Sequence, residues 1–192
     1  MPADIYLVRH GQNEDNIEGI LNGHRDRPLT ELGREQARTV AKKLKDNGIQ
    51  VIYSSPLKRA HETAQIIGSL LGLPVTVLPD LIERDFGCMT GRPVACIEDL
   101  PAHAILPTDG VTYFLEAEGS EDFPTLLERG KRVLAWVQAK HPEEHVLLVA
   151  HGDIGKMIRA AFHGWEWLDG LKTPYLDNTG VLELKPGADV LE

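Results

Sequence analysis

Two histidines in this chain stand in the same local setting, each following a short apolar run and preceding a glycine. His10 lies between Arg9 and Gly11, and His151 is followed by Gly152. Arg9 supplies a fixed cation whose planar fork of donors suits a phosphate or a carboxylate group. A glycine after each histidine removes a side chain where the backbone would approach a ligand closely. Together these residue types predict a site for an anion, provided that the fold brings the two motifs together.

Short runs rich in Val, Ile and Leu have the composition of buried strands in a parallel sheet. In open α/β sheets, ligands bind beyond the carboxyl ends of the strands. His10 and His151 should therefore face one crevice if the strands before them are neighbours. The expected strands cover residues 5–8, 51–53, 75–78 and 145–150, with a last strand at 179–184.

Helical periodicity fills the segments between these runs. Thr30 is the predicted N-cap of one helix, and Ser55 with Pro56 is predicted to start the next, with serine as the cap and proline in the first position. A later helix requires Pro124 in its first turn. Another begins near Asp153, which would bring the positive end of a helix close to the histidines.

From residue 86 to 119 the periodicity fails, and Gly, Pro, Asp and Thr accumulate. This composition favours an inserted lid or long loop over a further layer of secondary structure. We expect residues 1–192 to form a single α/β domain, a three-layer sandwich with a mainly parallel central sheet, helices on both faces and a lid at about 86–119.

Composition excludes several classes of function. The chain has 192 residues, of which 42% are hydrophobic and 26% are charged, and these values are typical of a folded globular domain. Its 20 basic and 29 acidic side chains give a net charge of −9, the wrong sign for general nucleic-acid binding. No apolar stretch approaches the ~18 residues of a membrane span. We expect a cytoplasmic protein with no nucleic-acid or membrane partner, and the sequence leaves open whether it forms a homodimer.

Metal-binding spacings are missing from the sequence. It has no Cys-x-x-Cys pair, no His-Glu-x-x-His helix and no His-x-His pair. Cys88 and Cys96 are expected to be reduced thiols, because a chain of this size does not need a disulfide. We therefore predict no metal and no cofactor.

Five blocks of sequence, in order, resemble the histidine phosphatase superfamily, also called phosphoglycerate mutase-like. Arg-His-Gly alone is a weak signal, but five blocks in this order are specific. The resemblance covers most of the chain and weakens between about 88 and 119. The blocks are residues 7–16 (LVRHGQNEDN), 23–37 (GHRDRPLTELGREQA), 54–64 (SSPLKRAHETA), 81–87 (LIERDFG) and 149–152 (VAHG).

The resemblance implies a phosphohistidine enzyme. His10 matches the nucleophile that holds the phosphoryl group between two half-reactions, and Glu83 matches the general acid that protonates the leaving alkoxide. Arg9, Arg59 and His151 match the positions that compensate the phosphoryl charge. The expected substrate contacts are Asn16, which matches a side chain near the phosphoryl oxygens, together with Asn22 and Gly152.

Several positions depart from the pattern of the family. Thr90 precedes Gly91 where many members carry an acidic residue, and residues 119–121 read Gly-Ser-Glu instead of Gly-Glu-Ser. Asn22 stands where glutamine is common. These departures affect the substrate assignment and leave the phosphohistidine core intact.

The leading hypothesis is a metal-independent phosphomonoesterase that hydrolyses a small phosphorylated metabolite. A cofactor-dependent phosphoglycerate mutase is the main alternative, although the resemblance implies that such mutases have a longer insertion with more basic residues. Residues 88–119 contain Arg92 as their one Lys or Arg. A catalytically silent phosphate-ligand or protein-binding module is a second alternative. A silent binder would have no physical need for both a nucleophile and an acid.

Overall fold

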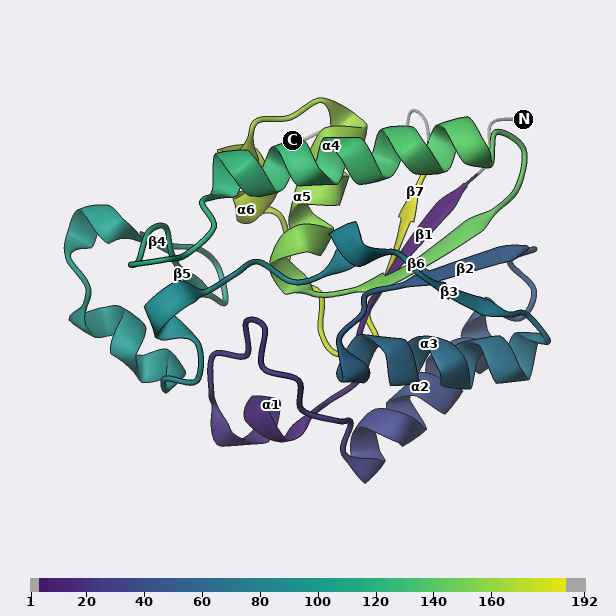
Figure 1. Ribbon diagram of the computed structural model, residues 1–192, viewed down its shortest axis with the longest axis horizontal. Helices are drawn as coiled ribbons and strands as arrows, with labels where there is room; N and C mark the ends of the chain where they lie inside the picture. The colour runs from purple at the N-terminus through teal and green to yellow at the C-terminus, as the bar shows by residue number, and fades with distance from the viewer. Residues whose placement is uncertain (1–3, 186–192) are drawn as a thin grey trace.

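The computed structural model describes residues 4–185, which build a five-stranded sheet with helices on both faces (Figure 1). The strand order is β3-β2-β6-β1-β7. Neighbouring strands are parallel except at one edge, where β7 pairs antiparallel with β1. The strands are β1 (Ile5–Arg9), β2 (Val51–Ser54), β3 (Val75–Val77), β6 (Val146–Ala150) and β7 (Val181–Leu184).

Each face of the sheet has its own apolar core. Val8, Leu147 and Val149 pack against the helices of one face, whereas Leu7, Leu148 and Ala150 pack against those of the other, as alternation along a strand requires. The expected three-layer α/β sandwich is confirmed. The first face carries α2 (Glu31–Leu44) and α3 (Lys58–Leu71), and the second carries α4 (Phe123–Lys140), α5 (Gly152–His163) and α6 (Trp167–Lys172) (Figure 1).

The helices α2 and α4 begin as the capping residues predict, whereas the predicted start of α3 is corrected. Thr30 caps α2 by accepting a hydrogen bond from Gly33 N, and Pro124 lies in the first turn of α4, as predicted. The start of α3 is different, because Leu57 is its N-cap and its first residue is Lys58. Ser55 still donates its backbone N–H to Val149 O. The chain therefore remains extended past Ser55, and its hydroxyl is available for another contact.

Residues 86–119 form short elements that the sequence analysis did not resolve. Figure 1 shows this teal segment at one end of the molecule, near the short helix α1 (Glu14–Glu18). A separate apolar cluster of Leu21, Phe86, Met89, Ile97 and Phe114 holds the segment together. Its role as a lid within a single domain stays a prediction. The elements are three 3₁₀ turns (Gly87–Met89, Val94–Asp99 and Ala102–Ala104) and a two-stranded antiparallel pair, β4 (Ile105–Pro107) and β5 (Thr112–Phe114).

A 3₁₀ turn at Pro79–Leu81 follows β3 and leads into the chain around Glu83.

Cys88 and Cys96 are free thiols. Within residues 4–185, no helix has the length and apolar character needed to span a membrane.

Candidate active site

The two histidines lie side by side at the carboxyl ends of neighbouring strands. β1 and β6 pair in parallel with Arg9 opposite Ala150, so the residues that follow them, His10 and His151, meet. Their ring centroids are 5.1 Å apart, and both side chains are buried. The strand-end motifs therefore share one crevice, as the sequence predicts.

The hydrogen bonds of His10 fix which ring nitrogen carries the proton. Nδ1 lies 2.7 Å from the carbonyl oxygen of Gly11, which only accepts hydrogen bonds, so Nδ1 is the protonated nitrogen. Nε2 then carries the lone pair, and Arg59 Nε donates to it at 3.2 Å. His10 thus presents an unprotonated Nε2 at the site.

Arg59 is fully buried and contacts both the site and the loop before α2. Its Nη1 and Nη2 donate to the backbone carbonyls of Arg25 and Gly23 at 2.6 and 2.9 Å. Burial lowers the pKa of Arg59 to about 10, against the raising effect of nearby carboxylates such as Glu83, so the group stays charged at neutral pH. The site therefore holds a permanent cation next to His10.

His151 and Arg9 direct hydrogen-bond donors into the same region. Ser55 Oγ lies 2.7 Å from His151 Nε2 and accepts from Leu57 N, so its own proton is available to that nitrogen. This arrangement leaves a proton on His151 Nδ1. Within the described part of the chain, His151 Nδ1 and Arg9 Nε are buried without a hydrogen-bond partner. Unpartnered buried donors are costly, and a bound anion that accepts hydrogen bonds from them would remove this cost.

Both histidines are held neutral. Burial is the main cause that lowers the pKa of each ring well below the ordinary value of 6.5. The charge of Arg59 acts in the same direction on both rings, and Arg9 adds to it. A neutral imidazole is the nucleophilic form, so these surroundings keep His10 competent over a wide pH range.

Glu83 is buried against the start of α5. Its Oε1 accepts from Ile154 N at 3.2 Å and from Arg84 N at 2.8 Å, and its Oε2 accepts from Asp153 N at 3.4 Å. The positive end of this helix was expected near the site, and the structure shows that it binds this carboxylate. Burial and the Asp153 carboxylate nevertheless raise the pKa of Glu83, which favours the protonated acid.

Arg84 and Asp153 form a buried ion pair beside Glu83. Arg84 Nε donates to Asp153 Oδ2 at 2.8 Å, and Arg84 Nη2 donates to the carbonyl of Phe114 at 3.1 Å. The guanidinium carbon lies 4.0 Å from the ring centroid of Phe114 and 4.3 Å from that of Phe123. Arg84 thereby ties the loop of Glu83 to the 86–119 segment and to α4.

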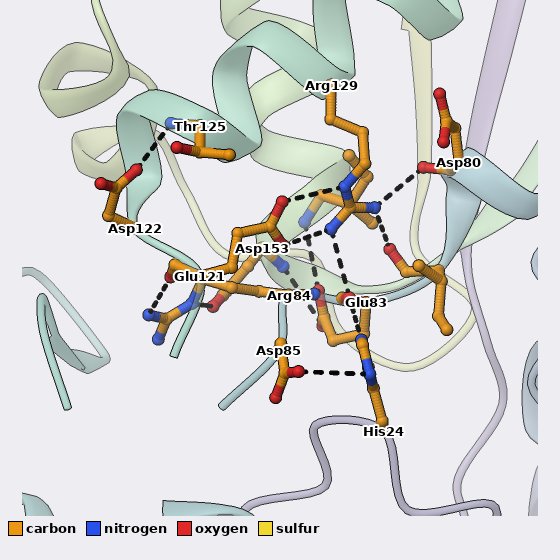
Figure 2. Close-up of polar contacts among 12 residues, drawn as sticks. His24, Asp80, Glu83, Arg84, Asp85, Glu121, Asp122, Thr125, Arg129 and Asp153 are labelled. Atoms are coloured by element: carbon orange, nitrogen blue, oxygen red, sulfur yellow. Dashed lines mark hydrogen bonds and ion pairs between the residues drawn. The ribbon is translucent and has the colours of Figure 1, made fainter. Parts of the chain in front are cut away.

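Arg129 of α4 binds the backbone carbonyls around Glu83 (Figure 2). Its guanidinium donates to the carbonyls of Asp80, Ile82 and Glu83. It also forms a two-pronged ion pair with Glu121, at 3.1 and 2.6 Å. Glu121 belongs to the Gly-Ser-Glu departure noted in the sequence, so in this fold the departure serves to secure the loop of Glu83.

Asn16 and Asn22 belong to a network of amides at the cavity. Asn13 Nδ2 donates to Asn22 Oδ1 at 2.6 Å, and Asn13 caps α1 in a reciprocal arrangement with Asn16. Asn178 Nδ2 donates both to Asn16 Oδ1 and to the carbonyl of His10. The network fixes His10 relative to α1.

The glycines after the histidines have steric roles that differ from the expected ligand approach. A Cβ at Gly11 would lie 2.5 Å from the carbonyl oxygen of Gly33, so this glycine allows two chain segments to cross closely. A Cβ at Gly152 would lie 2.7 Å from Tyr175 Oη. Gly152 does line the cavity, together with Tyr175.

A cavity of about 200 Å³ opens onto these groups. The expected site residues Arg9, His10, Asn16, Asn22, Arg59, Glu83 and Gly152 line it. His151 does not line it, but its ring packs against that of His10. Within residues 4–185, no three His, Cys, Asp or Glu side chains are grouped to hold a metal ion.

Sequence reasoning missed several residues that complete this arrangement. Ser55 was interpreted as a helix cap, and nothing local marked Asp153 or Arg129 as neighbours of Glu83. The asparagine at position 13, three residues before Asn16, carried a detectable signal, because this spacing is that of a capping box.

The chain belongs to the histidine phosphatase superfamily (branch 1), whose family model matches residues 5–191. The fold and the paired strand-end histidines agree with this assignment. The family resemblance stated from the sequence is thereby confirmed.

Some of the similar relatives and solved structures carry phosphatase names, and other relatives are named as phosphoglycerate mutase or mutase-like proteins. The chain is 35% identical over 148 residues to "uncharacterized phosphatase PhoE" of Bacillus subtilis (strain 168), covering 77% of this chain and 71% of that protein. It is 34% identical over 186 residues to "putative phosphoserine phosphatase 2" of Hydrogenobacter thermophilus, covering 94% and 88%. A mycobacterial glucosyl-3-phosphoglycerate phosphatase structure superposes with a TM-score of 0.81 at 27% identity, covering 95% of this chain and 90% of that one. These matches support phosphatase activity on a small phosphorylated molecule.

Replacing Arg129 with methionine should destabilise the fold strongly. The substitution leaves the mostly buried Glu121 carboxylate without its partner and the carbonyls of Asp80 and Ile82 without their donor, and breaking a buried pair costs about 3–5 kcal/mol. Arg132→Met is the matched control on the same helix, since Arg132 forms an exposed pair with Asp80 worth about 1 kcal/mol or less. Urea unfolding of both variants measures the loss in the free energy of unfolding, and equal losses would contradict the role of Arg129.

Stability should fall in mild acid through His10. Its pKa is below 6.5 in the folded protein, so below pH 6.5 the unfolded chain binds more protons and the folded state loses stability as pH falls. Between pH 7.5 and 5.5 the free energy of unfolding of the wild type should fall by on the order of 1 kcal/mol more than that of His10→Asn, which lacks this titration. Urea unfolding at both pH values tests this, and identical losses would show that His10 titrates normally in the folded state.

Proposed function

We propose that this protein is a metal-independent phosphomonoesterase that works through a phosphohistidine on His10. The observation that carries the proposal is the orientation of His10, whose unprotonated Nε2 shares the cavity with Arg59 and Glu83. An anion-binding or silent module would not need this combination of a neutral nucleophile and a buried carboxylic acid. The phosphatase names of the relatives agree with the proposal.

In the first half-reaction, the lone pair of His10 Nε2 attacks phosphorus and the bond from phosphorus to the ester oxygen breaks. Protonated Glu83 gives its proton to the departing oxygen, which leaves as an alcohol. The cations of Arg9 and Arg59 and the donor on His151 Nδ1 offset the charge that develops on the equatorial oxygens. Hydrogen bonding of His10 Nδ1 to Gly11 O keeps the ring oriented throughout.

In the second half-reaction, the Glu83 carboxylate takes a proton from water while the water oxygen attacks phosphorus. The bond between phosphorus and Nε2 breaks, and orthophosphate is released with His10 and Glu83 restored. A phosphoglycerate mutase would instead return the phosphoryl group to a second phosphorylated acceptor, and an assay for that transfer beside hydrolysis separates the two activities. The cytoplasmic location and the oligomeric state stay predictions from the sequence.

A rapid quench with labelled substrate should trap a phosphoryl adduct on His10 that is labile in acid and stable in base. The His10→Ala variant should form no adduct, because the neighbouring His151 ring carries its proton on Nδ1 and contacts Ser55 through Nε2. Wild-type turnover should persist in EDTA. Label on another residue, undiminished turnover by His10→Ala, or complete loss in EDTA with rescue by one metal would each contradict this mechanism.

Glu83→Gln should slow phosphoenzyme formation selectively. Its amide cannot supply a proton, so an alkyl phosphate with a poor leaving group should react about 10² to 10⁴ times more slowly. An activated aryl phosphate should lose less than about tenfold, since its phenolate leaves unaided. Single-turnover measurements on both substrates test this. An equal loss on both would reassign Glu83 to phosphate positioning or folding.

A further inference from the structure

The cavity lining contains two chemically different sets of residues. One set, which we name the phosphoryl end, comprises Arg9, His10, Arg59 and Glu83. The other set, which we name the apolar wall, comes from the loop after α1 and from the 86–119 segment. The apolar wall comprises Ile20, Leu21, Phe86, Ile97, Val111 and Phe114.

Among the described residues that line the cavity, no unpaired basic side chain belongs to this wall. The Lys and Arg residues among the cavity-lining residues of the described chain are Arg9, Arg59 and Arg84. Arg59 is engaged by His10 and two carbonyls. Arg84 is 1% exposed, paired with Asp153 and covered by phenylalanine rings. Arg9 belongs to the phosphoryl end, so the wall offers no cation to a second anionic group.

The carboxylates at the cavity also disfavour a substrate with a second anionic group. Asp15 and Asp153 both line it, and each is already neutralised, by Arg25 at 2.9 and 3.1 Å and by Arg84 at 2.8 Å. A carboxylate or second phosphate on a substrate would meet uncharged side chains and paired acids, with no unpaired cation among the described lining residues outside the phosphoryl end. Transfer of an unpaired charge from water to such surroundings is strongly unfavourable.

Given the proposed phosphatase function, on which this inference rests, we propose that the natural substrate is a phosphomonoester with an uncharged, mainly apolar alcohol part. The alcohol part would contact the apolar wall while the phosphoryl group occupies the phosphoryl end. The relatives are named for phosphoserine and glucosyl-3-phosphoglycerate, whose alcohol parts carry a carboxylate. The apolar wall of this chain offers no cation to such a carboxylate.

Matched pairs of substrates test the proposal. Ethyl and butyl phosphate differ by two methylenes, and each buried methylene should raise kcat/KM about fourfold, which is ~0.8 kcal/mol, until the cavity is filled. Butyl phosphate and 4-phosphonooxybutanoate have leaving groups of similar basicity and differ in a terminal carboxylate. The carboxylated ester should have a kcat/KM at least about tenfold lower.

Placing a cation on or beside the wall should remove this preference. Val111→Lys on the wall, or Thr112→Lys at the neighbouring lining position, should raise kcat/KM for the carboxylated ester relative to butyl phosphate by at least about tenfold, and both positions are half-buried. Val77→Lys, on the exposed strand β3, is the control and should leave the ratio unchanged.

The outcomes separate this inference from the proposed function. Equal or better turnover of the carboxylated ester, with normal phosphorylation of His10, would overturn the apolar substrate class and leave the phosphatase mechanism standing. An unchanged ratio in both lysine variants would show that the alcohol part lies elsewhere. Failure to hydrolyse any ester, without a phosphohistidine, would overturn both proposals.

Discussion

Arg59 lies buried beside His10, and its Nε donates to the ring nitrogen that faces the cavity. A permanent cation at this position opposes protonation of the ring and is also the charge that a phosphoryl group needs. The same guanidinium is bound to the carbonyls of Gly23 and Arg25, so its orientation depends on the loop before α2. The strand ends, the helix α3 that carries Arg59 and this loop must all be in place before the nucleophile has its proper tautomer and pKa.

Two opposing requirements on the carboxyl group of Glu83 explain how it is held. An acid must be buried to stay protonated at moderate pH, but a buried carboxylate needs hydrogen-bond donors. The first turn of α5 supplies them, and the neighbouring carboxylate of Asp153 offsets part of their effect on the pKa. Arg129 fixes the backbone from the other side by binding its carbonyls (Figure 2). The acid therefore has a fixed position without a direct ion pair that would keep it ionised.

The 86–119 segment links substrate selection to this machinery. Phe114 accepts a hydrogen bond from Arg84 through its carbonyl and contributes its ring to the apolar wall. Arg84 in turn pairs with Asp153, beside the acid. Changes in the segment thus alter the shape of the wall and reach Glu83 through a short chain of contacts.

The sequence by itself determined the architecture and the placement of the paired histidines. Short Val, Ile and Leu runs specify buried parallel strands through local periodicity, and ligands bind where such strands end. The family resemblance added Glu83 and Arg59, which no local pattern distinguishes from surface residues. In the run of residues 83–85, Glu83 and Arg84 are buried whereas Asp85 is partly exposed, and neither composition nor spacing separates them.

Tertiary structure decided the features that depend on contacts between distant parts of the chain. Ser55 contacts His151, 96 residues away, and Glu83 accepts from Ile154, 71 residues away. Arg129 binds the carbonyl of Glu83 across 46 residues. The apolar wall likewise combines the loop after α1 with the 86–119 segment. Hydrophobic periodicity reports only which face of its own element a residue occupies, so the partners of these side chains become defined only when the elements pack.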